Sequence, residues 1–134
     1  MDKLIINRKI SMKAKVTEGF KIQISQELQD GMNKLDAELK FLEQRAKKLI
    51  TELTLKGSPQ VASVREQLEY EKQKREEAKK TMSEQLKIVG NLEMGKEVLQ
   101  EEIEGPIEVK VGDNWLELMK REIVIEDGII VEIR

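Results

Sequence analysis

The most regular feature of the chain is a run of apolar residues in its first half, spaced alternately by four and three positions. This spacing averages 3.5 residues, the period at which two helices keep the same faces in contact as they wind around each other. The sequence therefore predicts a long helix that takes part in a coiled coil. The pattern defines it over residues 25–55, and we expect the helix to begin nearer Thr17. The repeat comprises Leu28, Met32, Leu35, Leu39, Leu42, Ala46, Leu49 and Leu53.

A second helical pattern follows a short break in the chain. Gly57 suits the left-handed conformation that ends many helices, Pro59 suits the first turn of a new helix, and Ser58 is the expected N-cap. The second helix is predicted over residues 59–89. Because the connection is only a few residues long, the two helices should run antiparallel, as a coiled-coil hairpin over residues 17–90.

Two charged residues interrupt the apolar positions of the second helix. Glu71 and Arg75 occupy places where apolar residues are due, and with the turn centred near residue 57 they face Leu39 and Leu42. In one interpretation their long side chains cover these leucines while the charged ends reach water, and the patch sets the register of the helices. In the other, the gap is a hinge or a notch in which a partner docks.

Strand patterns flank the helices. Residues 3–16 alternate apolar and polar side chains, which is typical of a strand with one buried face. Strand patterns resume after residue 95 and are interrupted by Gly105-Pro106, which marks a bulge, a corner or an edge. The first strand and four later ones predict a small antiparallel sheet or partly open barrel, made of residues 1–16 and 95–134. The fold class is therefore α+β, with the helical hairpin inserted after the first strand.

Two local features refine the C-terminal part. Asn114 and Glu117 have the spacing of a capping box and predict a short helix, in which Trp115 is expected to anchor the core. In the last β-hairpin, a two-residue turn at Asp127-Gly128 would set Ile123 opposite Glu132 instead of an apolar residue. We therefore predict a three-residue loop over residues 126–128, a type I turn with Gly128 in the left-handed conformation.

Composition argues against catalysis. The chain contains no His and no Cys, which removes the usual general base, the thiolate nucleophile and the commonest metal ligands. We therefore expect no enzyme activity, no catalytic residue, no cofactor and no metal site. Glu101, Glu102, Glu104 and Glu108 form an acidic run, and solvated strand acids are the preferred interpretation over a cation site. Apolar runs are shorter than a membrane span needs, so a cytoplasmic protein without a membrane partner is expected.

The net charge of −2 hides a strong asymmetry along the chain. Residues 1–16 carry five bases and one acid, whereas residues 91–134 carry five bases and twelve acids. If these segments share one sheet, cross-strand Lys–Glu pairs should form.

The far end of the predicted hairpin is basic. Residues 45–65 hold five bases and a single acid, Glu52, giving a net charge of +4. Exposed cations on a projecting arm can contact phosphates, which predicts an RNA-binding or ribonucleoprotein-binding tip. The competing interpretation is that these cations only keep the helices hydrated, because aromatic residues that stack on bases are scarce. The candidate nucleic-acid contacts are Arg45, Lys47, Lys48, Lys56 and Arg65.

A second hypothesis concerns protein partners. Transcript-cleavage factors carry acids at the tip of a similar hairpin, so the basic tip counts against that role. Prefoldin-type chaperones combine coiled coils with β-hairpins through which they assemble. The alternative function is therefore a protein-interaction or chaperone-like module that acts as a homo-oligomer.

Two C-terminal stretches resemble a known family. The sequences GPIEVKVGDNW at residues 105–115 and IEDGIIVEI at residues 125–133 are similar to the YlqD family of small bacterial cytoplasmic proteins, found mainly in Gram-positive bacteria. The order of strand, long helices and β-rich tail is similar too. The resemblance implies no catalytic or binding residue. Genes of this family tend to lie among genes for ribosome maturation and signal recognition, which favours a role beside RNA or the ribosome.

Overall fold

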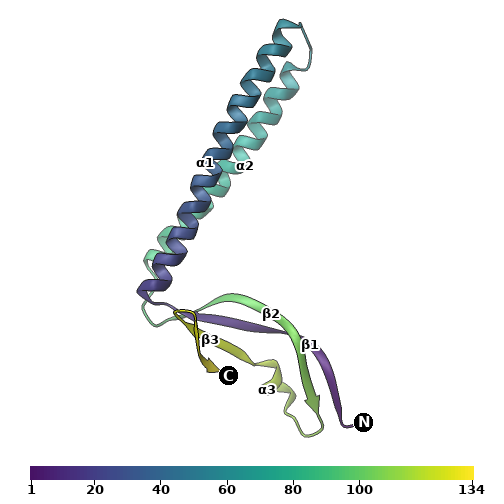
Figure 1. Ribbon diagram of the computed structural model, residues 1–134, viewed down its shortest axis with the longest axis vertical. Helices are drawn as coiled ribbons and strands as arrows, with labels where there is room; N and C mark the ends of the chain where they lie inside the picture. The colour runs from purple at the N-terminus through teal and green to yellow at the C-terminus, as the bar shows by residue number, and fades with distance from the viewer. The chain divides into compact units, whose positions relative to one another are not determined.

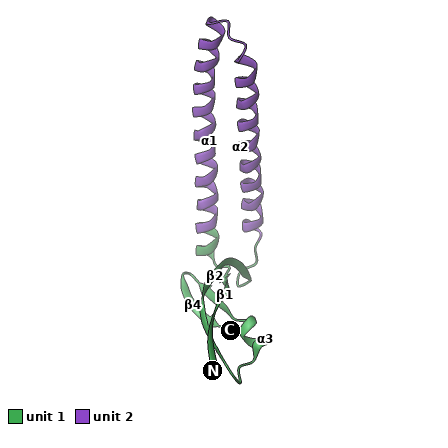
Figure 2. Cartoon of the chain, turned by 90° about the vertical axis from the view of Figure 1, so that its right-hand side faces the viewer, with its two compact units in different colours: residues 1–22, 92–134 green, residues 23–91 purple.

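The computed structural model describes residues 1–134 and divides into two compact units, which are shown in Figures 1 and 2. One unit contains residues 1–22 and 92–134, and the other contains residues 23–91. The class is α+β with the long helices inserted after the first strand, as predicted. The elements in chain order are β1 (Lys3–Lys15), α1 (Glu18–Leu55), α2 (Val61–Gly90), β2 (Glu97–Lys110), α3 (Trp115–Met119), β3 (Glu122–Glu126) and β4 (Ile129–Ile133).

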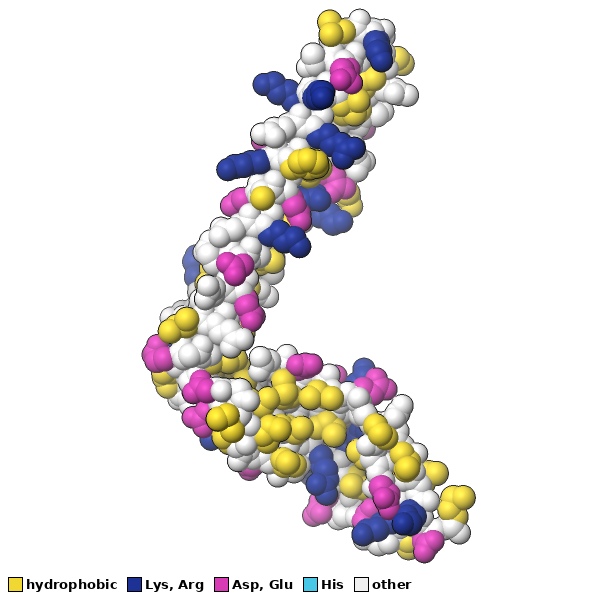
Figure 3. Space-filling model, viewed as in Figure 1, with side chains coloured by type: hydrophobic (Ala, Val, Ile, Leu, Met, Phe, Trp, Pro, Cys, Tyr) yellow, Lys and Arg dark blue, Asp and Glu magenta, His cyan; other side chains and the backbone are white.

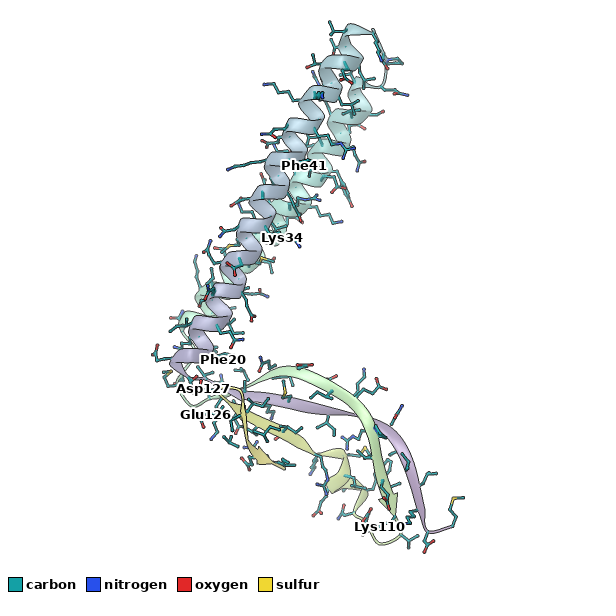
Figure 4. All side chains as sticks on the ribbon, in the orientation of Figure 1. Phe20, Lys34, Phe41, Lys110, Glu126 and Asp127 are labelled. Atoms are coloured by element: carbon teal, nitrogen blue, oxygen red, sulfur yellow. The ribbon has the colours of Figure 1, made fainter.

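Thr17 starts the first long helix, which confirms the predicted early start. Its hydroxyl oxygen accepts the backbone N–H of Phe20 at 3.0 Å, and its carbonyl accepts that of Lys21 at 3.0 Å. These bonds satisfy backbone donors that a helix start leaves without partners. The same hydroxyl donates to the carboxylate of Asp127 at 2.6 Å, so the β3–β4 turn lies beside the first turn of α1 (Figure 4).

The end of α1 at Leu55 is also as predicted, and Gly57 has the left-handed backbone expected of it, with φ of 64°. The start of α2 is not. The N-cap is Gln60, which makes no side-chain capping bond, whereas Ser58 accepts the backbone N–H of Gln60 at 3.2 Å. The expectation that Ser58 caps α2 is therefore wrong. Ser58 lies two residues before the N-cap Gln60, and its hydroxyl stabilises the connecting turn.

Cross-helix ion pairs define the register of the hairpin. Arg75 Nε lies 3.1 Å from Glu38 Oε2, and Lys72 Nζ lies 3.2 Å from Glu43 Oε1. Lys79 pairs with Asp36. In each pair the two residues are nearly equally far along the chain from Gly57, so α1 and α2 run antiparallel, side by side (Figure 2).

The charged interruption at Glu71 and Arg75 is satisfied within the hairpin. Arg75 bonds to the carboxylates of both Glu71 and Glu38, and this guanidinium holds the pKa of Glu71 below its ordinary value.

A contact between the helices also explains why residue 31 is a glycine. A methyl group added at residue 31 would come within 3.0 Å of the sulfur of Met82, so glycine there leaves room for a side chain of the opposite helix.

The sheet has the strand order β2-β1-β3-β4 and is open and mixed. It has four strands and not the expected five, because β2 continues through Gly105-Pro106. β1 pairs antiparallel with β2, and β3 pairs antiparallel with β4, but β1 and β3 are parallel. The expectation of an entirely antiparallel sheet is corrected at this one pair. β3 pairs with the free edge of β1 and not with β2. Because β1 and β3 both run opposite to β2, these two neighbours are parallel. Gly105-Pro106 lies within the edge strand β2, where a missing backbone donor is tolerated, as predicted.

The final β-hairpin corrects a second expectation. Asp127 and Gly128 both have positive φ, 49° and 80°, and Glu126 pairs with Ile129, which is a two-residue turn of type I′ and not a three-residue loop. The register then shifts, so that Val131 is an extra residue in β4 and Ile123 lies opposite Ile133. Because of this bulge, Ile123 and Ile125 both have apolar partners, which the prediction had explained by a longer loop. Only the left-handed Gly128 is confirmed.

The pairing register gives the sheet two chemically different faces. We call the first the apolar face; its single basic residue, Arg8, donates hydrogen bonds to the carbonyls of Leu118 and Met119 at the end of α3. The opposite face, which we call the charged face, carries all the ion pairs of the sheet. The apolar face comprises Leu4, Ile6, Ile10, Met12, Ala14, Val98, Ile103, Ile107, Val109, Ile123, Ile125, Ile130 and Ile133.

The core of the sheet unit is small. Ala14, Val16 and Val124 are its buried hydrophobic residues. Asn114 caps α3 as predicted, accepting the backbone N–H of Glu117 at 3.2 Å. Trp115, however, is 57% exposed, so the prediction that it anchors the core is wrong. A single layer of sheet has no second layer to enclose this side chain, and it lines an open groove of about 430 Å³ with Leu4, Val109 and Leu118.

Arg134 is the centre of the ion pairs on the charged face. Its guanidinium lies 2.5 Å from Glu97, 2.9 Å from Glu122 and 3.0 Å from Glu132. Hydrogen bonds from Arg134 lower the pKa of Glu97 and of Glu122, and Lys13, 3.0 Å from Glu122, adds to the second effect. Lys13–Glu122 and Lys3–Glu108 confirm the predicted cross-strand Lys–Glu pairs.

Replacing Gly128 by Val should lower the free energy of unfolding by about 1–2 kcal/mol, because a β-branched residue is strained at φ of 80°. No atom lies within 4 Å of the position of the added Cβ, so the cost is one of backbone conformation. Urea unfolding measures it. Gly128→Asn, which tolerates this conformation, is the control and should stay near the wild type. Equal stability of all three proteins would contradict the turn assignment.

Acid should weaken the sheet unit through Glu97 and Glu122. Because the folded-state pKa of each lies below the ordinary value of 4.5, their contribution is fully present above that value. It is lost as the pH falls through the lowered pKa. Arg134→Gln should therefore reduce the decline in unfolding free energy between about pH 7 and pH 3. The comparison is urea unfolding of both proteins across this range. An identical pH dependence would show that Arg134 does not shift these carboxyl groups.

Candidate functional site

The predicted basic residues are all exposed at the turn end of the hairpin. Arg45, Lys47 and Lys48 lie on α1, Lys56 directly follows α1, and Arg65 lies on α2. None of the five takes part in an ion pair. The cations further along α2 are different, since three of them bind acidic residues of α1. The cations near the turn therefore contribute little to joining the helices and remain available to a ligand.

Three of these cations share one side of α1 with an aromatic residue. Arg45, Lys48 and Lys56 follow Phe41 at helical spacing, and the backbone N–H of Lys56 still donates to the carbonyl of Glu52 at 3.2 Å. Lys34, two turns before Phe41, continues the same row. We call this row, Lys34, Phe41, Arg45, Lys48 and Lys56, the α1 stripe. It extends over about 33 Å at a rise of about 1.5 Å per residue.

The other two predicted cations lie off this stripe. Lys47 is two residues from Arg45, which turns it about 160° around the helix axis. Arg65 belongs to the opposite helix. Glu52 lies on the stripe between Lys48 and Lys56 and is its one acid near the turn. The structure therefore groups part of the predicted set and leaves Lys47 and Arg65 apart from it.

Exposed aromatic residues are the feature that sequence reasoning missed. Phe41 is 60% exposed and Tyr70 is 62% exposed, on α1 and α2 respectively. Figure 4 shows Phe41 and Lys34 along the same helix. The signal was present in the sequence, because Phe41 directly precedes Leu42 of the apolar repeat and so cannot share its face. An exposed aromatic ring beside cations is a surface on which a nucleic-acid base can stack.

A shallow groove opens between the helices next to Arg45. Its volume is about 210 Å³, and its surface is mostly apolar. The short side chains of Ala46 and Val64 leave this space, because neither reaches the opposite helix as a leucine does. The groove is lined by Leu42, Arg45, Ala46, Leu49, Val64, Gln67, Leu68 and Glu71. Arg45 thus joins the α1 stripe to an accessible apolar surface.

The acidic run on β2 is divided between the faces of the sheet. Glu101 lies opposite Met12 on the apolar face, whereas Glu102 lies opposite Ser11 on the charged face. Nowhere does the fold gather three His, Cys, Asp or Glu side chains in an arrangement able to hold a metal ion. Neither long helix has a stretch apolar enough to cross a lipid bilayer.

A hairpin of two long helices, inserted after the first strand of a four-stranded open sheet, defines a two-unit class of α+β proteins. Comparison with known families identifies the particular one. The chain belongs to the YlqD protein family, whose model matches residues 4–134. This confirms the resemblance seen in the C-terminal stretches.

One solved structure extends the comparison. A crystal structure of a protein of unknown function from Synechococcus sp. WH 8102 is 32% identical, with a TM-score of 0.88. The match covers 100% of this chain and 99% of that one. No protein with a curated description matches the chain.

Filling the groove should stabilise the hairpin. Ala46→Leu adds apolar surface where space exists, and we expect the free energy of unfolding to rise by about 0.5–2 kcal/mol. Ala37→Leu, at an exposed position of the same helix, is the matched control and should change it by less than about 0.5 kcal/mol. Thermal and urea unfolding measure both. Destabilisation by Ala46→Leu alone would show that the helices pack too closely there to accept a larger side chain.

Proposed function

We propose that this protein is a non-catalytic adaptor that contacts RNA, free or within a ribonucleoprotein such as the ribosome, through the α1 stripe. The observation that carries the proposal is a row of cations without protein partners, on the same side of a helix as an exposed aromatic ring. Cations supply attraction to phosphates, and the ring supplies stacking that is tolerant of sequence. Single-stranded RNA presents both groups at once.

Local structure supports this choice of surface. The cations of the stripe need not leave an ion pair before they bind a phosphate, so binding does not weaken the hairpin. Figure 3 shows Lys and Arg side chains projecting along the part of the hairpin near its turn. The length of the stripe, about 33 Å, is enough to follow a strand over several nucleotides.

Salt dependence separates the two contributions to binding. The triple variant Arg45→Gln, Lys48→Gln, Lys56→Gln should bind a single-stranded RNA of about 20 nucleotides more weakly. Its plot of log K against log salt should be less steep by about 2, since each phosphate contact contributes about 0.7. Phe41→Ala should weaken binding by about 5-fold to 150-fold and leave that slope unchanged, because stacking releases no counterions. Fluorescence anisotropy at several KCl concentrations gives both quantities.

The matched control removes the same charge elsewhere on the hairpin. Lys74, Lys80 and Lys87 of α2 are exposed and take part in no ion pair, and their replacement by Gln should lower affinity less than the stripe variant does. Circular dichroism establishes that every variant keeps its helices. If the stripe variant retains the wild-type affinity and salt slope, the proposed site is wrong. Equal losses in both triple variants would reduce the effect to net charge.

A further inference from the structure

The apolar face of the sheet is exposed in the single chain. On this face Ile103 is 41% exposed and Ile130 is 56% exposed. Ile133, which pairs with Ile123 at the end of β4, is exposed as well. Figure 3 shows a broad area of hydrophobic side chains on the sheet unit. Contiguous apolar surface of this extent is uncommon on monomeric proteins and marks an interaction site.

Layer architecture explains why this face needs a partner. A sheet with one apolar face is stable when that face packs against another layer, a helix or a second sheet. Within this unit α3 lies along the first half of β1, between Leu4, which shares a groove with Leu118, and Arg8, which donates to the carbonyls of Leu118 and Met119. The short helix leaves Ile103 and Ile130 uncovered. The second layer is therefore missing from the single chain.

Charge indicates what the missing layer is made of. All five ion pairs of the sheet unit lie on the opposite face, including those that Arg134 makes with Glu97, Glu122 and Glu132. On the apolar face Arg8 already has hydrogen-bond partners, and Glu101 lies on the edge strand β2, where it can stay in water. A surface without available charges is matched by another such surface. RNA, which carries a phosphate at every nucleotide, is a poor match.

The size of the face suits a second copy of the chain. Thirteen residue pairs join β1 to β2, and β3 and β4 have five residues each. With strands about 4.8 Å apart and about 3.3 Å per residue, these elements cover on the order of 600 Å², part of which α3 already occupies. Two copies together would therefore bury at most on the order of 1,200 Å², the lower end of the range of specific interfaces.

We propose that two copies of this chain pack their apolar faces together into a two-layer sandwich related by a twofold axis. Each copy then supplies the layer that the other lacks, and the same residues contact each other from both sides. The charged faces remain in water on the outside. This interface lies in a different unit from the α1 stripe, so the dimer and RNA binding stand or fall separately.

Neighbouring residues of β4 provide a matched test. Ile130 pairs with Ile125 on the apolar face, whereas Ile129 pairs with Glu126 on the charged face, and both are more than half exposed. Sedimentation equilibrium of the full chain from about 1 µM to about 100 µM should show a dimer. Ile130→Glu should raise the dimer dissociation constant at least a hundredfold, and Ile129→Glu should change it by less than threefold. Circular dichroism checks that both variants are folded.

If Ile130→Glu fails to fold, Ile130→Thr keeps the β-branched shape of the strand residue and should raise the dissociation constant about tenfold. The absence of Cys from the natural chain offers an independent measurement. A nitroxide attached to Ile130→Cys should report a partner label close across the interface. A wild-type protein that is monomeric at about 100 µM overturns the proposal, even if it captures another protein. Equal dissociation by Ile129→Glu and Ile130→Glu also overturns it.

Discussion

The pairing of β1 with β2 is the interaction on which the rest of the fold depends. The two strands are separated in sequence by the whole helical hairpin, yet they match over thirteen residue pairs from Lys3–Lys110 to Lys15–Glu97. Two further backbone bonds of 2.8 Å, between Val16 and residues Lys96 and Gly95, continue the ladder to the ends of the inserted segment. Closing so long a loop costs conformational entropy, and a long ladder offsets it. The hairpin helps as well, because its own cross-helix contacts shorten the effective loop.

The same pairing gives the sheet unit its unusual balance of surfaces. β1 alternates except at Ile5 and Arg8, so one side of the ladder collects most of the apolar residues while the other collects most of the lysines and glutamates. β3 then adds to the free side of β1 and continues both faces without a break in register. The ion pairs of Arg134 close the charged face across three strands. No comparable contact covers Ile103 and Ile130 on the apolar face, which is why a second copy of the sheet is the partner we infer.

In the hairpin, the charged residues that join the two helices differ from those that remain available to a ligand. In its middle, cations of α2 bind acids of α1 and set the antiparallel register. Nearer the turn the cations have no such partners, and Phe41 projects on the same side of α1 as Arg45 and Lys48. A binding surface made of residues that packing does not require can exchange ligands without unfolding the helices. This division suits the adaptor role that we propose.

Local patterns in the chain were enough to predict the long helices and the first strand, but not that the two strands expected on either side of Gly105-Pro106 form the single strand β2. The 3.5-residue repeat, Gly57 and Thr17 set the long helices, and the alternation of residues 3–16 set the first strand, because these are local consequences of periodicity and capping. The basic set near the turn was also readable, since helix and charge are both encoded locally. Three other features follow from the assembled sheet: β3 runs parallel to β1, a bulge at Val131 corrects the register of the last hairpin, and Trp115 stays exposed. Each of these depends on which strand edge is free and on how many layers cover the sheet, and neither property is contained in any one segment.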